Sequence, residues 1–172
     1  MHKWSGKRSI GRKFRVPGAS ALTAALRLRQ MGYGVTIFEA LPVAGGMMRV
    51  GIPDYRLPPE VLDKEIKEIE DIGVTINTNS PVESIDDLKK QGYDAVFIGT
   101  GAGLPWFMEV PGETLNGVYS ANGYLTRMNL MGGYKYPRSS TPIVKHRNVA
   151  TIGGGNVAMD CARTAARLGA DN

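Results

Sequence analysis

The sequence predicts an α/β fold with a mainly parallel sheet, and three observations support this class. Short stretches rich in β-branched and aromatic residues alternate with stretches whose apolar residues recur at helical spacing. Such alternation is typical of parallel strands joined by helices. Glycine makes up 22 of the 172 residues, and several glycines follow an expected strand or end an expected helix. No apolar stretch approaches the ~20 residues that a membrane-spanning helix needs.

Local patterns place the elements in chain order. Residues 19–30 (ASALTAALRLRQ) combine helix formers with an apolar face, and the stretch MGYG ends this helix. Residues 35–39 (VTIFE) predict a buried strand. Residues 42–57 are rich in glycine and proline and predict a long loop, which is uncommon unless the loop has a function. The other expected helices span 59–72, 85–90, 121–130 and the residues after 155, and the other expected strands span 74–79, 94–98 and 149–152.

The positive charge of the chain is confined to its first residues. The formal net charge is +5, yet without the six basic residues of the segment 1–15 the chain has 15 basic against 16 acidic residues. A basic arm can bind nucleic acid or an acidic surface, but no recognition helix, aromatic stacking pattern or zinc spacing accompanies this one. We therefore expect a solvated tail and no nucleic-acid partner. Its basic residues are Lys3, Lys7, Arg8, Arg12, Lys13 and Arg15.

The cysteine content restricts the classes of site that the chain can build. Cys161 is the single cysteine. A chain with a single cysteine cannot form an internal disulfide framework, and it cannot by itself hold a cysteine-ligated metal cluster. Together with the absence of a signal-peptide pattern, this composition favours the cytosol.

The strongest functional motif is the run GGGNVA at Gly153–Ala158, which matches G-x-G-x-x-A between an expected strand and an expected helix. Gly153 permits a tight turn, Gly155 lets a diphosphate approach the backbone, and Ala158 lets the helix pack close to the strand. The N–H groups and the dipole at the helix start attract the diphosphate. An ordinary glycine-rich turn is the structural alternative. We expect a dinucleotide-binding turn in a Rossmann-like fold.

A second dinucleotide site is only half present. Glu39 ends an expected strand, where a carboxylate can accept hydrogen bonds from both hydroxyls of an adenosine ribose, and such an acid lies ~20 residues after a glycine fingerprint. Counting back gives residues 16–21, of which only Gly18 is a glycine, and Val16 occupies the first glycine position. The preceding KRSIGRKF has no apolar run that could form the central first strand. A solvated carboxylate at a strand end is the alternative for Glu39.

Four stretches resemble the FAD- and NADPH-binding small (beta) subunit of glutamate synthase. They are VTIFEALPVAGGMMRVGIPDYRLP, DAVFIGTGAGLPWFMEVPGE, LNGVYSANGYLTRMN and NVATIGGGNVAMDCARTAARLGA. Similar modules occur in dihydropyrimidine dehydrogenase and in electron-bifurcating ferredoxin:NADP oxidoreductase. The resemblance covers residues 19–170 and implies an oxidoreductase that passes hydride from NAD(P)H to FAD. Electrons would continue to iron–sulfur clusters on missing or partner parts, such as a glutamate synthase large subunit. The cofactors carry this chemistry, so no catalytic side chain and no membrane partner is expected.

The resemblance also implies a set of cofactor-binding residues. Glu39 would bind the FAD ribose, and Ala40 to Met47, with Gly45 and Gly46, would wrap the flavin diphosphate. Arg56 would reach FAD through charge-assisted hydrogen bonds, with a surface arginine as the alternative. The remaining positions for FAD would be Gly18, Val82, Gly99, Thr100 and Gly101, and those for NAD(P)H would be Gly153, Gly154, Gly155, Asn156, Val157, Ala158 and Met159. Asp160 and Arg163 are expected to cap or pair on their own helix.

Three departures from the family pattern predict an incomplete doubly wound fold. The first strand and its glycine turn are replaced by a patternless basic segment, no iron–sulfur domain precedes this region, and the chain stops one helix into the second nucleotide domain. We expect a basic tail at 1–15, a partial FAD-binding domain with a connecting segment at 16–147, and the start of an NAD(P)-binding domain at 148–172. A gene fragment with a shifted reading frame and a divergent amino terminus are alternative explanations.

The incomplete fold also predicts how this chain behaves alone. The strands at 35–39 and 94–98 would lack a central neighbour, so we expect marginal stability and weak FAD retention. An inactive nucleotide-binding fragment is therefore the alternative to an active oxidoreductase module. The choice between NAD and NADP depends on a following strand that the sequence does not contain.

Overall fold

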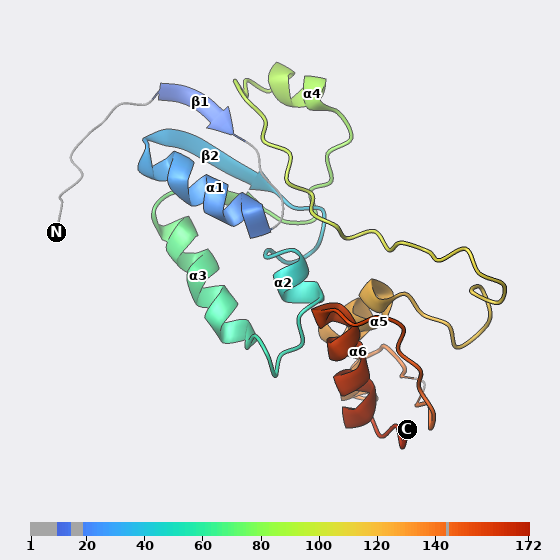
Figure 1. Cartoon of the computed structure of the whole chain (residues 1–172). Helices are drawn as coiled ribbons and strands as arrows, with labels where there is room; N and C mark the ends of the chain where they lie inside the picture. The colour runs from blue at the N-terminus through green and yellow to red at the C-terminus, as the bar shows by residue number, and fades with distance from the viewer. Residues whose placement is uncertain (1–9, 15–18, 144) are drawn as a thin grey trace. The chain divides into compact units, whose positions relative to one another are not determined.

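The computed structural model describes residues 10–14, 19–143 and 145–172. These residues form two compact units (Figure 1). The first unit comprises the described residues up to Gly46 together with Asp63–Gly101, and the second comprises Met47–Leu62 and Ala102–Asn172. The early loop and the carboxyl-terminal half of the chain therefore belong to the same unit.

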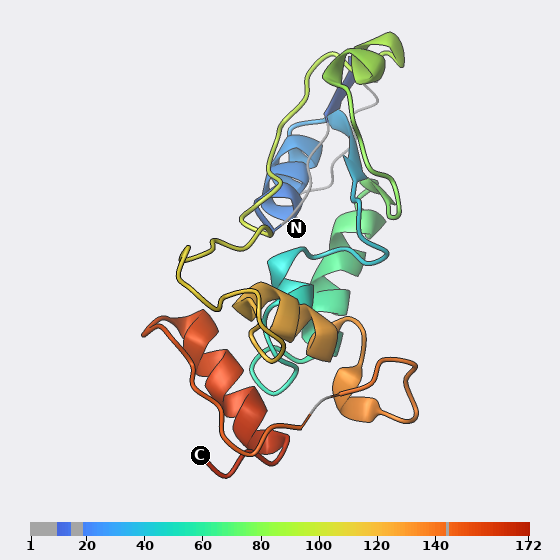
Figure 2. The ribbon, with the colours of Figure 1, turned by 90° about the vertical axis from the view of Figure 1, so that its right-hand side faces the viewer.

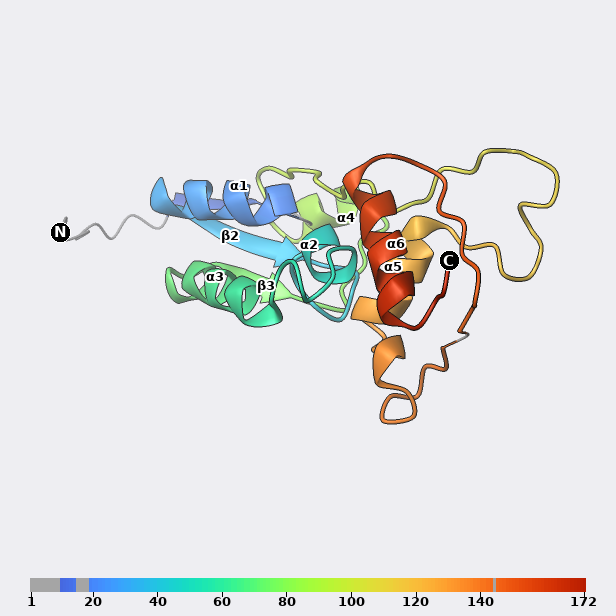
Figure 3. The same cartoon turned by 60° about the horizontal axis from the view of Figure 1, so that its bottom comes forward.

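A three-stranded parallel sheet organises the first unit. The strands β1 (Ile10–Phe14), β2 (Tyr33–Phe38) and β3 (Thr75–Asn77) lie in the order β1-β2-β3. Helix α1 (Ala19–Gln30) connects the first two strands and packs along β2 (Figure 3). Helix α3 (Pro59–Asp71), which begins in the second unit, precedes β3. This alternation of strands and helices confirms the predicted α/β class.

The core of the first unit lies between these elements because each one presents an apolar face. The β2 side chains alternate, so that Val35 and Ile37 are buried. A hydrogen bond joins the carboxyl-terminal ends of α1 and α3: the Nε of Arg29 donates to the carbonyl of Ile72, the residue after α3, at 2.7 Å. Helix α4 (Ile85–Lys90) starts at a serine cap and buries one leucine. The buried apolar residues of this unit include Ala21, Leu22, Ala25, Ile69, Val74 and Leu88.

Strand β1 differs from the expectation that no strand precedes residue 19. It pairs in parallel with β2, and its register is irregular between Ile10 and Lys13. Strand pairing is satisfied through backbone N–H and C=O groups, so a segment without an apolar run can still extend a sheet. β2 therefore has a neighbour on each side, and the prediction that it lacks one on the β1 side is wrong.

The expected strand at 94–98 does not form. The structure gives this segment no regular secondary structure, and the side chains of Phe97 and Ile98 are exposed. Apolar β-branched residues favour an extended backbone, but a strand exists only where a neighbour receives its hydrogen bonds. The prediction was made from composition alone, which does not supply that neighbour.

The second unit is built from helices. It contains α2 (Met47–Val50), α5 (Ala121–Asn129), the short 3₁₀ helix η1 (Gly133–Lys135) and α6 (Asn156–Arg167). Helices α5 and α6 lie side by side (Figure 2). α5 begins at Ser120, whose hydroxyl accepts from the N–H of Gly123. The core of the second unit includes Val50, Leu125, Met128, Ala158, Cys161 and Ala165.

The expected strand at 149–152 is also absent, and Ile152 is 75% exposed. At one end of the segment, the N–H of Val149 donates to the carbonyl of Asn172 at 2.8 Å. A strand inside a parallel sheet needs partners along both edges. Among the described residues, the segment therefore leads into the glycine turn without joining a sheet.

In the part of the chain that the structure describes, no helix is long and apolar enough to cross a membrane. Among the same residues, no group of three or more histidine, cysteine, aspartate or glutamate side chains is arranged to hold a metal ion.

Candidate functional site

The glycine turn at the start of α6 has part of the geometry that the fingerprint predicts, because the helix forms but the preceding strand does not. Gly153 has a φ of +132°, a conformation that side chains rarely adopt, and a Cβ placed on it would lie 3.2 Å from the Cβ of Ala158. A Cβ on Gly154 or Gly155 would meet nothing within 4 Å. The turn is thus closed on the side of the helix at Gly153 and open to solvent at the next two glycines.

The N-terminus of α6 leaves backbone donors available at this turn. Gly155 is the N-cap and supplies no side-chain hydrogen bond, and the first helical bond within this region runs from the Met159 N–H to the Gly155 carbonyl at 3.1 Å. The preceding N–H groups of Asn156, Val157 and Ala158 have no intrahelical partner. Asn156 and Val157 are exposed. A diphosphate fits here, because N–H groups without an intrahelical partner and the helix dipole both favour an anion.

Glu39 lies just beyond the end of β2, as predicted, and it is only 7% exposed. Its backbone N–H donates to the carbonyl of Asn77, and its own carbonyl accepts from the N–H of Ser80, both at 2.8 Å. Its carboxylate Oε1 accepts from the N–H of Leu41 at 3.1 Å. The backbone therefore holds the carboxylate at the carboxyl end of a parallel strand, where nucleotide riboses bind in open α/β sheets.

The other residues expected at a flavin site within the first unit fall into three groups. Gly45 and Gly46 both have positive φ values, +116° and +54°, and follow Glu39 in an irregular segment with Ala40 exposed.

Val82 is half-buried and lies two residues after Ser80, whose N–H donates to the Glu39 carbonyl. Gly99, Thr100 and Gly101 lie in the irregular segment that replaces the expected strand. Gly18 lies outside the described residues. These cofactor assignments remain predictions.

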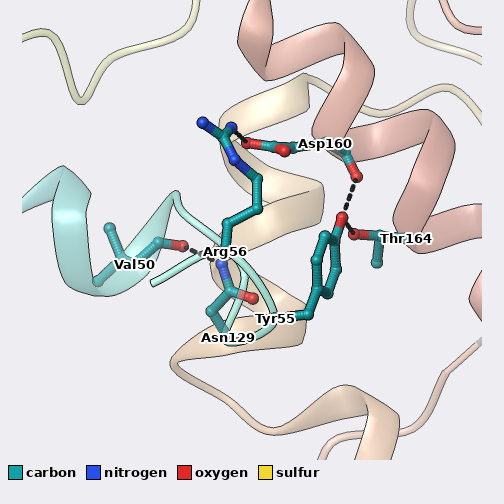
Figure 4. Close-up of polar contacts among 6 residues, drawn as sticks. All are labelled: Val50, Tyr55, Arg56, Asn129, Asp160 and Thr164. Carbon is teal, nitrogen blue, oxygen red and sulfur yellow. Dashed lines mark hydrogen bonds and ion pairs between the residues drawn. The ribbon is translucent and has the colours of Figure 1, made fainter. Parts of the chain in front are cut away.

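Arg56 lies in the second unit and already has a partner there. Its Nη1 donates to Asp160 Oδ2 at 2.6 Å, and the side chain of Asp160 is 4% exposed against 37% for Arg56 (Figure 4). The sequence predicted that Asp160 would cap or pair on its own helix, whereas its partner comes from the loop before α3. Met47, the first residue of α2, is half-buried in the same unit. Whether Arg56 also reaches FAD remains a prediction.

Sequence reasoning missed the neighbours of this ion pair. Tyr55 contacts α6 beside Arg56, and its Oη lies 3.4 Å from both the Asp160 carbonyl and Thr164 Oγ1. The Arg167 guanidinium lies 3.9 Å from the centre of the Tyr55 ring. The spacing of Asp160, Thr164 and Arg167 puts three polar residues on one helix face, and this pattern was the available signal.

We expect Cys161 to be an unreactive thiol. Burial, and secondarily the charge of Asp160, raises the pKa of Cys161 to about 11. Because the thiolate is the reactive form, iodoacetamide at pH 8 should alkylate the native chain on the order of a hundredfold more slowly than a free cysteine. Mass spectrometry over time measures this rate, and the rate should climb steadily as the pH is raised toward the pKa. A native rate equal to that of the urea-unfolded chain would contradict this prediction.

The fold and the glycine turn define a nucleotide-binding α/β module, and comparison with known proteins places it. Residues 17–172 match the family "Pyridine nucleotide-disulphide oxidoreductase", to which the chain belongs. Proteins of this family bind FAD and NAD(P)H. The family match confirms the predicted Rossmann-like class.

Individual relatives confirm the resemblance found in the sequence. The NADP(+)-dependent formate dehydrogenase subunit beta of Moorella thermoacetica is 47% identical over 167 residues, which is 93% of this chain and 22% of that protein. The glutamate synthase [NADPH] small chain of Bacillus subtilis is 32% identical over 94% of this chain and 34% of its own length. FprA from Mycobacterium tuberculosis, solved in complex with NADPH, shares the fold with a TM-score of 0.75 at 24% identity over 91% of this chain and 36% of that one. The chain thus spans about a third or less of each of these proteins.

Proposed function

We propose that this chain is the dinucleotide-binding part of an NAD(P)H-dependent flavoprotein that delivers electrons to a partner. Its membership of the pyridine nucleotide-disulphide oxidoreductase family supports the nucleotide chemistry. The observation that carries the proposal is the turn at Gly153–Ala158, which is open at Gly154 and Gly155 and leads into the uncapped start of α6. The named relatives that support an electron-transfer role are subunits of larger enzymes.

Different residues would bind each of the two cofactors. The N–H groups at the start of α6 would hold the NAD(P)H diphosphate, with Gly155 allowing its close approach. Glu39 would accept hydrogen bonds from the FAD ribose, and Gly45 and Gly46 would let the chain turn around the flavin diphosphate. When bound, the two cofactors supply hydride transfer and single-electron release. An iron–sulfur partner, such as a glutamate synthase large subunit, would receive those electrons.

A titration of the purified chain tests this proposal. NADPH is added while its fluorescence is recorded, first to the chain alone and then to the chain with added FAD. We expect saturable binding of one NADPH per chain, followed by loss of the visible flavin absorbance when FAD is present. Binding without flavin reduction would support the alternative of a nucleotide-binding fragment without activity. No saturable NADPH binding up to about 1 mM, the upper end of ordinary substrate affinities, would reject the proposed function.

We expect Glu39→Gln to weaken FAD binding about tenfold, because the amide keeps the shape but loses the charge that strengthens hydrogen bonds to the ribose. The Gln side-chain oxygen can still accept from the Leu41 N–H, so the fold should be retained. Fluorescence titration with FAD compares the two proteins. Glu83→Gln removes the same charge from an exposed position of the same unit and should change nothing. Equal FAD affinity in the wild type and Glu39→Gln would remove Glu39 from the site.

A further inference from the structure

The loop Pro53–Pro58 holds helix α6 through two neighbouring side chains (Figure 4). Arg56 Nη1 donates to Asp160 Oδ2 at 2.6 Å. The Tyr55 hydroxyl lies 3.4 Å from both the Asp160 carbonyl and Thr164 Oγ1. One loop thus contacts the helix by charge, by hydrogen bonding and, through the Tyr55 ring, by cation–π contact with Arg167. We call the pair Tyr55–Arg56 the α6 clamp.

The contacts made by the clamp follow a single face of α6. Their positions on the helix are Asp160, Thr164 and Arg167. Residues spaced by four and three positions lie above one another on a helix, so these contacts extend over about two turns. A grip at one residue would leave the helix free to rotate about its axis. Contacts along two turns fix both its rotation and its position along the axis.

The clamp loop is itself anchored, so it can act as a fixed support. The side-chain amide of Asn129 in α5 donates to the carbonyl of Val50 at 3.1 Å (Figure 4). The Tyr134 hydroxyl donates to Asp54 Oδ2 at 2.8 Å. These contacts tie the residues before Tyr55 to α5 and η1. Helix α6 is therefore positioned against a braced segment of its own unit.

Asp160 makes the clamp hard to open. Its side chain is only 4% exposed, and its Oδ1 is buried without a hydrogen-bond partner among the described residues. A buried carboxylate that loses its cation keeps the full cost of its desolvation. Arg56, the ion-pair partner that the structure shows for Asp160, thus makes the contact that fixes the start of the second turn of the helix.

We propose that Tyr55 and Arg56 are positioning residues that hold the Gly153–Ala158 turn in its diphosphate-binding geometry. Asp160 lies two residues after Ala158, so its anchor acts within the first turn and a half of α6. This inference rests on the proposed function for its ligand. The clamp touches no atom of the turn, and its effect passes through the helix backbone.

Hydrogen exchange of the full chain tests the clamp without any cofactor. In Arg56→Gln, the amides of residues 159–162, whose helical hydrogen bonds end on the carbonyls of residues 155–158, should exchange about tenfold faster than in the wild type, since a hydrogen bond to a charged group is lost. Amides of α5 should be accelerated less, because they exchange only when the whole unit opens. A merely structural role would accelerate exchange equally throughout the second unit. Tyr55→Phe should give a smaller increase confined to α6, and Arg163→Gln, an exposed charge on the same helix, is the matched control and should give none.

NADPH titration of the same variants completes the test. We expect the dissociation constant to rise about tenfold in Arg56→Gln and to stay unchanged in Arg163→Gln. Unchanged exchange at 159–162 in Arg56→Gln, acceleration spread evenly over the unit, or faster exchange with wild-type NADPH affinity would each overturn the proposal. A wild-type chain that does not bind NADPH would instead reject the proposed function, and exchange at residues 159–162 alone would then decide the positioning role.

Discussion

Replacing Gly155 by alanine should weaken NADPH binding at least about tenfold while leaving the stability of the chain unchanged. The second glycine of the fingerprint lets the diphosphate approach the backbone, and an added methyl group occupies that space. In this structure a Cβ on Gly155 would meet nothing within 4 Å, and the φ of −86° suits any residue. The substitution therefore separates an effect on the ligand from an effect on the fold. Fluorescence titration and urea unfolding measure the two quantities.

The two neighbouring glycines provide matched controls for that prediction. Gly154→Ala adds a methyl group in equally open space, at the variable position of the fingerprint, and should retain most of the affinity. Gly153→Ala should lower stability by about 1 kcal/mol or more, because φ is +132° and the new methyl group would lie 3.2 Å from Ala158. If Gly154→Ala and Gly155→Ala lose affinity equally, or neither does, the diphosphate does not lie against Gly155.

Removing Arg56 should destabilise the second unit by about 1 kcal/mol, because Asp160 would then be buried as an unpaired charge. The value is below that for a fully buried pair, since Arg56 is 37% exposed and water screens the attraction. The double variant Arg56→Gln with Asp160→Asn should recover about half of the loss by removing the stranded charge. Urea unfolding followed by circular dichroism gives the four free energies of the cycle.

The sign of the coupling free energy between Arg56 and Asp160 in this cycle tests the second prediction. We expect the double variant to be more stable than Arg56→Gln alone. Arg163→Gln removes one positive charge from the exposed face of the same helix and should change stability by less than about 0.5 kcal/mol. Losses that simply add in the double variant would show that the 2.6 Å contact contributes little free energy.

The helices were predictable from the sequence because their signals are local. The structure has α1 at Ala19–Gln30 and α4 at Ile85–Lys90, with the same bounds that apolar spacing and helix-stop residues predicted. α3 and α5 each end one residue earlier than predicted. Amphipathic spacing and caps act within a few residues. The glycine turn of α6 belongs to the same class of local signal.

The strands were less predictable because a strand depends on distant backbone groups. Residues 94–98 and 149–152 carry β-forming side chains but have no sheet neighbour among the residues that the structure describes. In contrast, β1 carries little apolar signal and still pairs with β2. Glu39 was predicted as the last residue of a strand, and in the structure it lies one residue after β2 ends. The ion pair between Arg56 and Asp160 joins residues 104 positions apart, and nothing in the local pattern of either residue indicates the other.

The long separation between Tyr55–Arg56 and their partners has a consequence for how the protein is made. These contacts join residues that lie 104 to 109 positions apart. A ribosome synthesises the chain from its amino terminus, so the loop emerges long before helix α6. The second unit, assembled from Met47–Leu62 and Ala102–Asn172, can therefore close only after α6 has been synthesised. Until then, the guanidinium of Arg56 faces water rather than Asp160.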